Sequence, residues 1–240
     1  MSRILGIKFN GKHSYYDIGV SMEYFKPQLP QPKTIEEEVP GVNGDGYDFS
    51  TILTNGEPVY TGRNLVCKFN LKGKDKIALE QRYTKVSEWL LGSPKKVELI
   101  SDSIPGYFFM AKVKEIPEWE ETKKVGFLTV TFRAEPYKQG TELAGDLLWD
   151  HIDFELPDFI QETKFTINGN KSITLYVSGS HSIIPKVVVD SSMSCTVNNY
   201  TAVFSPTKNT NWAFKLKPGA NTISISGTGN IDFQFRKEVL

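Results

Sequence analysis

Cysteine and histidine are scarce in this sequence. Among 240 residues there are two cysteines and three histidines. Cys67 and Cys195 each lie in an alternating pattern with apolar residues on the same strand face, which favours two small core residues over a disulfide. The histidines show no metal-ligand spacing with one another or with a cysteine; they are His13, His151 and His181. We therefore expect no metal site and no cofactor.

The chain also lacks an excess of charge of either sign, because 28 Lys and Arg residues balance 28 Asp and Glu residues. This balance gives no reason to expect nucleic acid or an anionic membrane as a primary partner. No apolar run approaches the roughly 20 residues that span a bilayer. The opening MSRILGIKFNG lacks the apolar core and cleavage site of a signal peptide. The sequence therefore predicts a protein made in a cytosol.

Glycine is concentrated in one stretch, VPGVNGDGYDFS, at residues 39–50. A phosphate-binding loop would follow an apolar strand and open a helix, but this stretch follows the Pro-rich run PQLPQPKTIEEE. As a calcium loop it has Gly41 at the first ligand position and Ile52 where a bidentate Glu is needed. Glycine with Asn or Asp is typical of tight turns. A structural turn is therefore predicted, built on Pro40, Gly41, Gly44 and Gly46.

Most of the chain shows the two-residue alternation of strands, interrupted by Gly, Pro and Asn. This pattern is typical of a mainly β, antiparallel structure. The predicted strands are ILGIKFN, NLVCKFNL, KVELIS, YFFMAKV, FLTVTFRA, KFTIN, SITLYV, KVVVD, AVFS, WAFKL, TISIS and IDFQFR. One helix is predicted at residues 74–91, where Leu79, Tyr83, Val86 and Leu90 form an apolar stripe that ends before Gly92.

The composition changes in EPYKQGTELAG, and we place a domain boundary near residues 140–145. Residues 1–140 are expected to form an α+β domain with one helix. Residues 141–240 are expected to form an antiparallel β-sandwich with turns at INGN, VSGS, VNNY and SGTGN. The Pro-rich run at about 26–40 cannot be a central strand. It is predicted to project as an arm or long hairpin.

Two groups of residues contain the side-chain types that catalysis uses. The stretch SGSHSII contains three serines around His181, but neighbours on a strand point to opposite faces and no nucleophile-elbow pattern surrounds them. The carboxylates Glu118, Glu120 and Glu121 lie in a charged run that is typical of a solvated hairpin end. The sequence therefore predicts that the protein is not an enzyme.

Sugar binding without catalysis remains open as the alternative. The second domain contains Trp149, Tyr200 and Trp212, and such aromatic side chains can present a face to a carbohydrate ring. A buried Trp in each sheet would give the same pattern. The alternative function is a non-catalytic carbohydrate-binding protein for attachment to a host cell wall.

Five stretches occur in order along the first 140 residues: GKHSYYDIGV, VPGVNGDGYDFS, YTGRNLVCKFNL, WLLGSPKKVELISDSIPGYFFMAKV and VGFLTVTFRAEPYKQG. The chain closes on LKPGANTISISGTGNIDFQFRKEVL. Together these stretches resemble the distal tail proteins of long-tailed, non-contractile bacteriophages and related prophages. In that family the Pro-Gly…Gly stretch matches a structural turn that ends the arm.

The resemblance implies a hexameric ring at the tip of the tail tube. The first domains would form a belt around a channel through which DNA passes without specific binding. One face of the belt would meet the tail-tube protein and the other the tail-associated hub protein. The second domains would be galectin-like sandwiches that point outward, toward receptor-binding or baseplate proteins. The resemblance places the protein in the virion tail tip after its synthesis in the bacterial host cytoplasm.

Overall fold

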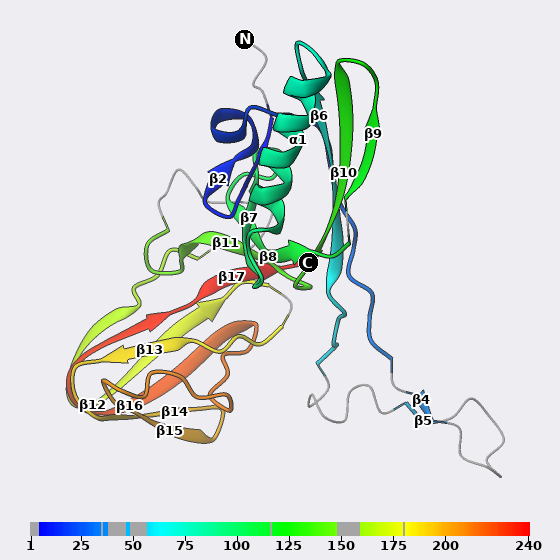
Figure 1. Cartoon of the computed structure of the whole chain (residues 1–240). Coiled ribbons are helices and arrows are strands. Elements are labelled where there is room, and N and C mark those ends of the chain that lie inside the picture. The colour runs from blue at the N-terminus through cyan, green and yellow to red at the C-terminus, as the bar shows by residue number, and fades with distance from the viewer. Residues whose placement is uncertain are drawn as a thin grey trace. The chain divides into compact units, whose positions relative to one another are not determined.

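The computed structural model of the chain describes residues 5–34, 36–37, 47–48, 57–115, 117–147, 159–179 and 181–240. The chain divides into two compact units (Figure 1), the first of residues 1–138 with Leu240 and the second of residues 139–239. The described strands pair almost entirely in antiparallel fashion. The predicted mainly β, antiparallel class is confirmed.

Unit 1 is built on one antiparallel sheet with the strand order β2-β1-β7-β8-β10-β6-β3, and β9 pairs with β10. The long central strands β6 and β10 are joined over their full length, from Lys72 opposite Val125 to Arg63 opposite Ala134. The strands are β1 (Ile7–Phe9), β2 (Lys12–His13), β3 (Ser21–Pro27), β6 (Arg63–Lys72), β7 (Val97–Ser101), β8 (Tyr107–Val113), β9 (Glu118–Glu121) and β10 (Val125–Ala134).

The core of unit 1 lies between this sheet and the helix α1 (Lys76–Leu91). Alternate residues of β6 are fully buried, as its sequence predicts; they are Leu65, Cys67, Phe69 and Leu71. The predicted apolar stripe of α1 also faces this core, with Leu79, Val86 and Leu90 buried and Tyr83 partly buried. The amphipathic pattern therefore predicted both the helix and the face that it buries.

The helix starts two residues later than predicted. Asp75 Oδ1 accepts a hydrogen bond from the backbone N–H of Ala78 at 2.8 Å, which makes Asp75 the N-cap. Gly92 is the C-cap, as predicted. The sequence interpretation missed Trp89, which is buried on the same face and donates from Nε1 to the backbone oxygen of Phe9 at 2.7 Å.

A second, short helix was not predicted. It is the π-helix η1 (Ser14–Ile18), and its N-cap is His13. Nδ1 of His13 accepts from the backbone N–H groups of Tyr15 and Tyr16 at 3.2 and 3.3 Å, while Nε2 lies 3.1 Å from Asp102 Oδ2. Because Nδ1 accepts, the ring proton belongs on Nε2, which donates to Asp102. A histidine cap of this kind leaves no periodic signal in the sequence.

Between β3 and β6 the described residues 28–34 and 57–61 run alongside each other as the two legs of an arm that leaves the sheet (Figure 1). Backbone hydrogen bonds join its two legs, from Lys33 to Val59 and from Thr61 to Gln31, and Gln28 donates to Asn64 of β6. Farther out, β4 (Glu36–Glu37) pairs with β5 (Tyr47–Asp48). The described residues 28–34 of the Pro-rich run are therefore one leg of the arm, and Lys26 and Pro27 belong to β3.

Unit 2 contains a five-stranded antiparallel sheet with the order β12-β16-β14-β15, in which β13 also pairs with β16. Two further strands, β11 and β17, pair with each other. The predicted boundary at residues 140–145 overlaps β11. The strands are β11 (Lys138–Leu143), β12 (Lys164–Val177), β13 (Lys186–Val189), β14 (Met193–Val197), β15 (Tyr200–Phe204), β16 (Gly219–Gln234) and β17 (Arg236–Val239).

Two predicted turns in unit 2 are wrong. INGN lies inside β12 and SGTGN inside β16, so each pair of predicted short strands is one long strand. Gly169 is paired with Gly227 in the ladder, and both have positive φ, 88° and 150°. The two strands can therefore bend at the same rung without losing their pairing. The predicted VNNY turn is confirmed, with Asn198 and Asn199 in the left-handed region between β14 and β15.

The predicted strand WAFKL is also wrong. Ala213 lies in a turn, the backbone N–H of Phe214 bonds to Asn211 O at 3.1 Å, and Leu216 makes an isolated bridge with Ile183. Phe214 and Leu216 are nevertheless fully buried. Two alternate side chains are therefore buried here by an irregular segment. The sequence pattern of such a segment is the same as that of a strand.

The core of unit 2 is a single apolar cluster. Along β16 the odd-numbered positions face it on both sides of the bend, with Ile223 and Ile225 on one side and Ile231 and Phe233 on the other. Sixteen residues of straight strand would extend about 50 Å. Because both halves of β16 contribute to one cluster, the sheet must curve around its own core.

Candidate interaction surfaces

The residues of the predicted structural turn lie outside the described part of the chain, as does Trp149; the turn residues are Pro40, Gly41, Gly44 and Gly46. The turn therefore stays a prediction.

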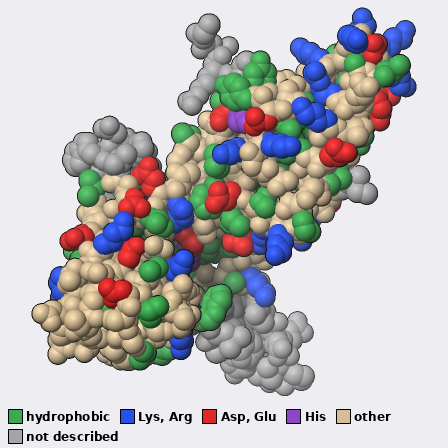
Figure 2. Space-filling view, turned by 60° about the vertical axis from the view of Figure 1, so that its left-hand side comes forward, with side chains coloured by type: hydrophobic (Ala, Val, Ile, Leu, Met, Phe, Trp, Pro, Cys, Tyr) green, Lys and Arg blue, Asp and Glu red, His purple; other side chains and the backbone are tan. Residues whose placement is uncertain are grey.

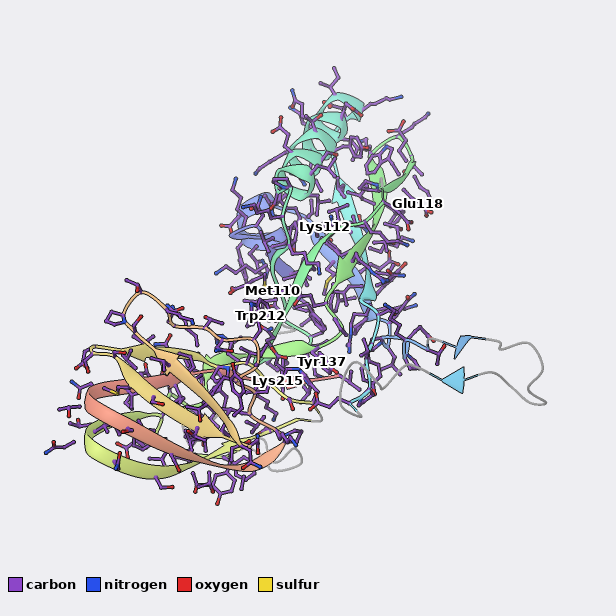
Figure 3. All side chains as sticks on the ribbon, turned by 90° about the horizontal axis from the view of Figure 1, so that it is seen from below. Met110, Lys112, Glu118, Tyr137, Trp212 and Lys215 are labelled. Atoms are coloured by element: carbon purple, nitrogen blue, oxygen red, sulfur yellow. The ribbon has the colours of Figure 1, made fainter. Side chains whose placement is uncertain are left out.

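The structure links Tyr200 to the segment that carries Trp212. Tyr200 begins β15, and Trp212 follows Asn211 in the connection to β16, where Figure 3 labels it. Tyr200 Oη donates to Asn211 Oδ1 at 3.3 Å, and the same oxygen accepts from the N–H of Ala213 at 3.0 Å. The side chain of Trp212 is 81% exposed and that of Tyr200 is 38% exposed. Neither side chain is therefore buried in the core, which was the other interpretation that the sequence allowed.

The segment around His181 packs onto β17. Nε2 of His181 lies 2.7 Å from Glu238 Oε2, and Glu238 Oε1 accepts from Gln139 Nε2 at 2.8 Å. Gly179 forms a parallel bridge with Glu238, at a point where a side chain would meet the Glu238 backbone. These contacts hold the segment to the β11–β17 pair.

The carboxylates of the predicted hairpin end lie on β9, in a hairpin with β10. Glu118, Glu120 and Glu121 are exposed, and Glu121 Oε1 lies 3.5 Å from Lys76 Nζ. The interpretation as a solvated hairpin end is confirmed.

Five exposed lysines gather at this end of unit 1, and we call them the lysine tip: Lys72, Lys74, Lys76, Lys123 and Lys124. Lys72 ends β6, Lys74 lies in the following loop and Lys76 begins α1. Lys123 and Lys124 lie in the turn between β9 and β10. A hydrogen bond from Gly73 N to Lys124 O, 2.9 Å long, joins these two segments. Figure 2 shows Lys and Arg side chains gathered at the upper end of the molecule.

The sequence interpretation missed the lysine tip because its two halves are about 50 residues apart in the chain. The available signal was the position of KGKDK at the end of one predicted strand and of KK before another. Pairing these two strands in antiparallel fashion would have placed both groups together.

Two negative findings apply to the described residues alone. Among the described residues, no group of three or more His, Cys, Asp or Glu side chains lies close enough together to hold a metal ion. None of their helices is long and apolar enough to cross a membrane.

Residues 11–134 match the model of a protein family described as the phage tail protein RIFT-related domain. The chain belongs to this family of phage tail proteins. The match covers more than half of the chain and runs from just before β2 to the last residue of β10. The resemblance seen in the sequence, to distal tail proteins of siphophages, is thereby confirmed.

The fold of this phage tail protein is also that of a solved distal tail protein. The crystal structure of SPP1 Dit (gp 19.1), described as a paradigm of the hub adsorption apparatus in phages that infect Gram-positive bacteria, matches with a TM-score of 0.63. The match covers 99% of this chain and 100% of SPP1 Dit at 11% sequence identity. No curated protein sequence matches the chain.

Proposed function

We propose that this phage tail protein forms a hexameric ring at the tail tip and joins the tail tube to the tail-associated hub and host-recognition proteins. The observation that carries the proposal is the match of unit 1 to the phage tail family, together with the Dit-like fold of the whole chain. The turn around Pro40, Gly41, Gly44 and Gly46 would serve as a structural part of the arm. The protein would act in the virion tail without catalysis and without a cofactor.

The open edge of unit 1 supports assembly. Among the described strands, β3 pairs on one side only, with β6, and the arm extends from its end. A free strand edge presents unpaired N–H and C=O groups that favour association with another chain. Head-to-tail contacts between identical subunits close into a ring when the rotation between them is a simple fraction of a turn.

The balance of charge supports a channel through which DNA slides. The chain has equal numbers of basic and acidic side chains. Contacts to many phosphates would make binding strong and salt-dependent and would retain the DNA. We therefore propose a channel that makes no sequence-specific DNA contact.

The first test is the solution mass of the full chain by light scattering over a concentration series, beside a fragment of residues 141–240. We expect a hexamer of the full chain and a monomer of the fragment. A variant in which residues 34–58 are replaced by Asn-Gly keeps β3 and β6, and we expect it to stay monomeric with an unchanged circular dichroism spectrum. A full chain that stays monomeric even with a tail-tube protein contradicts the proposal, and a hexameric arm variant contradicts the role of the arm.

A second candidate function, carbohydrate binding, is favoured by the exposure of Trp212 beside the Tyr200–Asn211 pair. We propose that Trp212 and Tyr200, with Trp149, form a face for cell-wall sugars. Titration with soluble cell-wall saccharides should change the tryptophan fluorescence of the full chain. Trp212→Ala should lose this response, whereas Tyr16→Ala, which removes an aromatic side chain of 73% exposure from unit 1, should keep it. No saturable response in the unsubstituted protein contradicts sugar binding.

A further inference from the structure

The outer face of the sheet in unit 2 carries a row of hydroxyl groups. Four strands lie side by side there, in the order β12, β16, β14 and β15 (Figure 1). Paired residues of neighbouring strands point their side chains to the same face. The pairing aligns four hydroxyl side chains across the strands, those of Ser172, Ser224, Thr196 and Thr201. The residues that alternate with them belong to the core, so this row faces solvent.

Two further rows flank the first, and their side chains are also short and uncharged. They are Asn170, Ser226, Ser194 and Val203 in one row and Thr174 and Thr222 in the other. We call the three rows the hydroxyl patch, which lies on one side of the bend at Gly169 and Gly227. By the spacing of strands and residues the patch measures about 14 Å in each direction, so it is wider than one sugar ring.

The hydroxyl patch contains no charged side chain. A solvated protein surface is commonly about 25–35% charged, and 23% of the residues of this chain are charged. The one charged residue within these strand segments is Lys171, whose Nζ lies over the ring of Phe165, 5.3 Å from its centroid. Lys171 alternates with the residues of the patch along β12. The composition of the patch therefore differs from that of an ordinary solvated face.

Most polar side chains of the patch have hydrogen-bonding groups to offer. Within the described part of the chain, the side-chain hydrogen bond of the patch is that between Thr196 Oγ1 and Thr201 Oγ1, at 2.8 Å. The side chains of Ser172, Ser224 and Thr222 bond to no described residue. Hydroxyl and amide groups both donate and accept. The patch can therefore bond to a ligand that does the same.

This chemistry distinguishes between classes of ligand. Nucleic acid is held by Lys and Arg, and membrane surfaces are held by apolar and basic side chains. Protein interfaces are enriched in aromatic residues, Met and Arg, and Ser and Thr seldom dominate their binding energy. The hydroxyl patch has none of the enriched types. A neutral saccharide offers hydroxyls that donate and accept, and it binds there without the cost of desolvating a charge.

An aromatic ring lies at the end of the patch. Tyr176 follows Thr174 on the same face of β12 and is 40% exposed. Its ring stacks on that of Phe159, with the centroids 4.9 Å apart. The contact holds the ring in place, and an ordered aromatic face can pack against the apolar face of a sugar.

We infer that the hydroxyl patch, with Tyr176 at its end, binds uncharged polysaccharide. The inference rests on the carbohydrate-binding candidate proposed above and assigns to it a surface other than that of Trp212. Tyr200 precedes Thr201 on β15, and successive residues of a strand point to opposite faces of the sheet. The two surfaces are therefore separate. Serine and threonine also lose little side-chain entropy when a ligand fixes them.

Affinity electrophoresis of the full chain tests this inference. The probes are dextran, mannan, galactan and laminarin, four neutral polysaccharides, each cast into a native gel. We expect at least one of them to slow the protein in proportion to its concentration. Thr174→Val with Thr222→Val should raise the polymer concentration for half-maximal slowing about tenfold, because valine keeps the shape and strand preference of threonine but removes two hydroxyls.

The matched control is Thr166→Val with Thr228→Val, which removes one exposed hydroxyl from each of the same two strands beyond the bend. This variant and Trp212→Ala should both be slowed as the unsubstituted chain is. Slowing that is lost in Trp212→Ala but kept in the Thr174 and Thr222 variant overturns the patch in favour of the Trp212 surface. The patch is also overturned if no gel slows the full chain, or if the two threonine pairs lose the response equally. The ring is tested separately by the solution mass, so a hexamer that no polymer slows overturns the patch and keeps the ring.

Discussion

At the scale of single residues, the two thiols are the groups whose chemistry the fold changes most clearly. Cys67 and Cys195 are both free and buried, each in the core of a different unit. Burial raises the pKa of the Cys195 thiol to about 12 and that of Cys67 above its ordinary value too, because the thiolate would lose its hydration. Both side chains therefore stay protonated in the folded protein at physiological pH.

This pKa shift predicts a loss of stability in mild base. Unfolded thiols ionise near their ordinary pKa of 9.0, while the folded ones stay neutral, so the unfolded state binds fewer protons as the pH rises. Each buried thiol makes its full contribution to the free energy of unfolding below pH 9. Above pH 9 this contribution falls by about 1.4 kcal/mol per pH unit for each thiol. Urea unfolding between pH 8 and 10.5 measures this slope. Cys195→Ala should remove the part of this pH dependence that the Cys195 thiol contributes in unit 2. An unchanged slope in that variant contradicts the prediction.

The sequence revealed the role of the cysteines but not that of His13. Cys67 is one of four alternate buried apolar residues on β6, and a pattern of this kind can be recognised from the sequence alone. His13 instead caps η1 with one ring nitrogen and contacts Asp102, 89 residues away, with the other. Nothing local to His13 indicates that second contact. Polar residues whose partners are distant in sequence are therefore not assignable from periodicity.

At the scale of elements, the hairpin of β9 and β10 depends on one close approach. Gly126 lies under the ring of Trp119, and a Cβ atom on Gly126 would come within 1.9 Å of Trp119 Cη2. Trp119 is in turn held against Tyr83 of α1, with ring centroids 4.6 Å apart. Gly126 thus leaves space for the aromatic contact between the hairpin and the helix.

We expect Gly126→Ala to destabilise the protein by about 1–3 kcal/mol, because Trp119 must move out of its place between the helix and the hairpin. Gly140→Ala is the matched control, because a Cβ atom at this position would meet Lys237 at 3.6 Å, an ordinary contact. The stability of this variant should not fall. Urea unfolding of both variants measures the difference. Gly126→Ala should cost much less in a Trp119→Ala background, and equal costs in the two backgrounds would show that Trp119 is not the cause.

Element types were more predictable than element ends. The strands β1, β6, β7, β8 and β10 and the helix α1 follow clear two-residue and 3.6-residue periodicities and were predicted, whereas the edge strand β3 was missed. Gly169 and Gly227 were interpreted as turns because a glycine next to Asn or Ser is typical of a chain reversal. Only their pairing across the ladder makes each a bend within a strand. This pairing joins residues too far apart in sequence for local rules to find.

At the scale of the whole molecule, the order of motifs carried more information than any one of them. Each quoted stretch is degenerate, yet together they indicated the phage tail family that the match to residues 11–134 confirms. The candidate surfaces were less accessible from the sequence. The lysine tip requires knowledge of which strands pair. The arm was predicted from its prolines as an arm or long hairpin, and the hydrogen bonds between its described legs are those of a hairpin.

The shared bend of β12 and β16 has a consequence for the time course of folding. These strands are distant in sequence, and their pairing brings Val177 next to Gly219 at one end and Lys164 next to Asp232 at the other. The first pair closes the shorter loop and loses less chain entropy. Pairing should therefore begin there and proceed toward Lys164, crossing the rung of Gly169 and Gly227, which has no side chains to pack. Unit 2 would acquire its structure by a slow, directional zipping, since nonlocal strand pairing limits the folding rate.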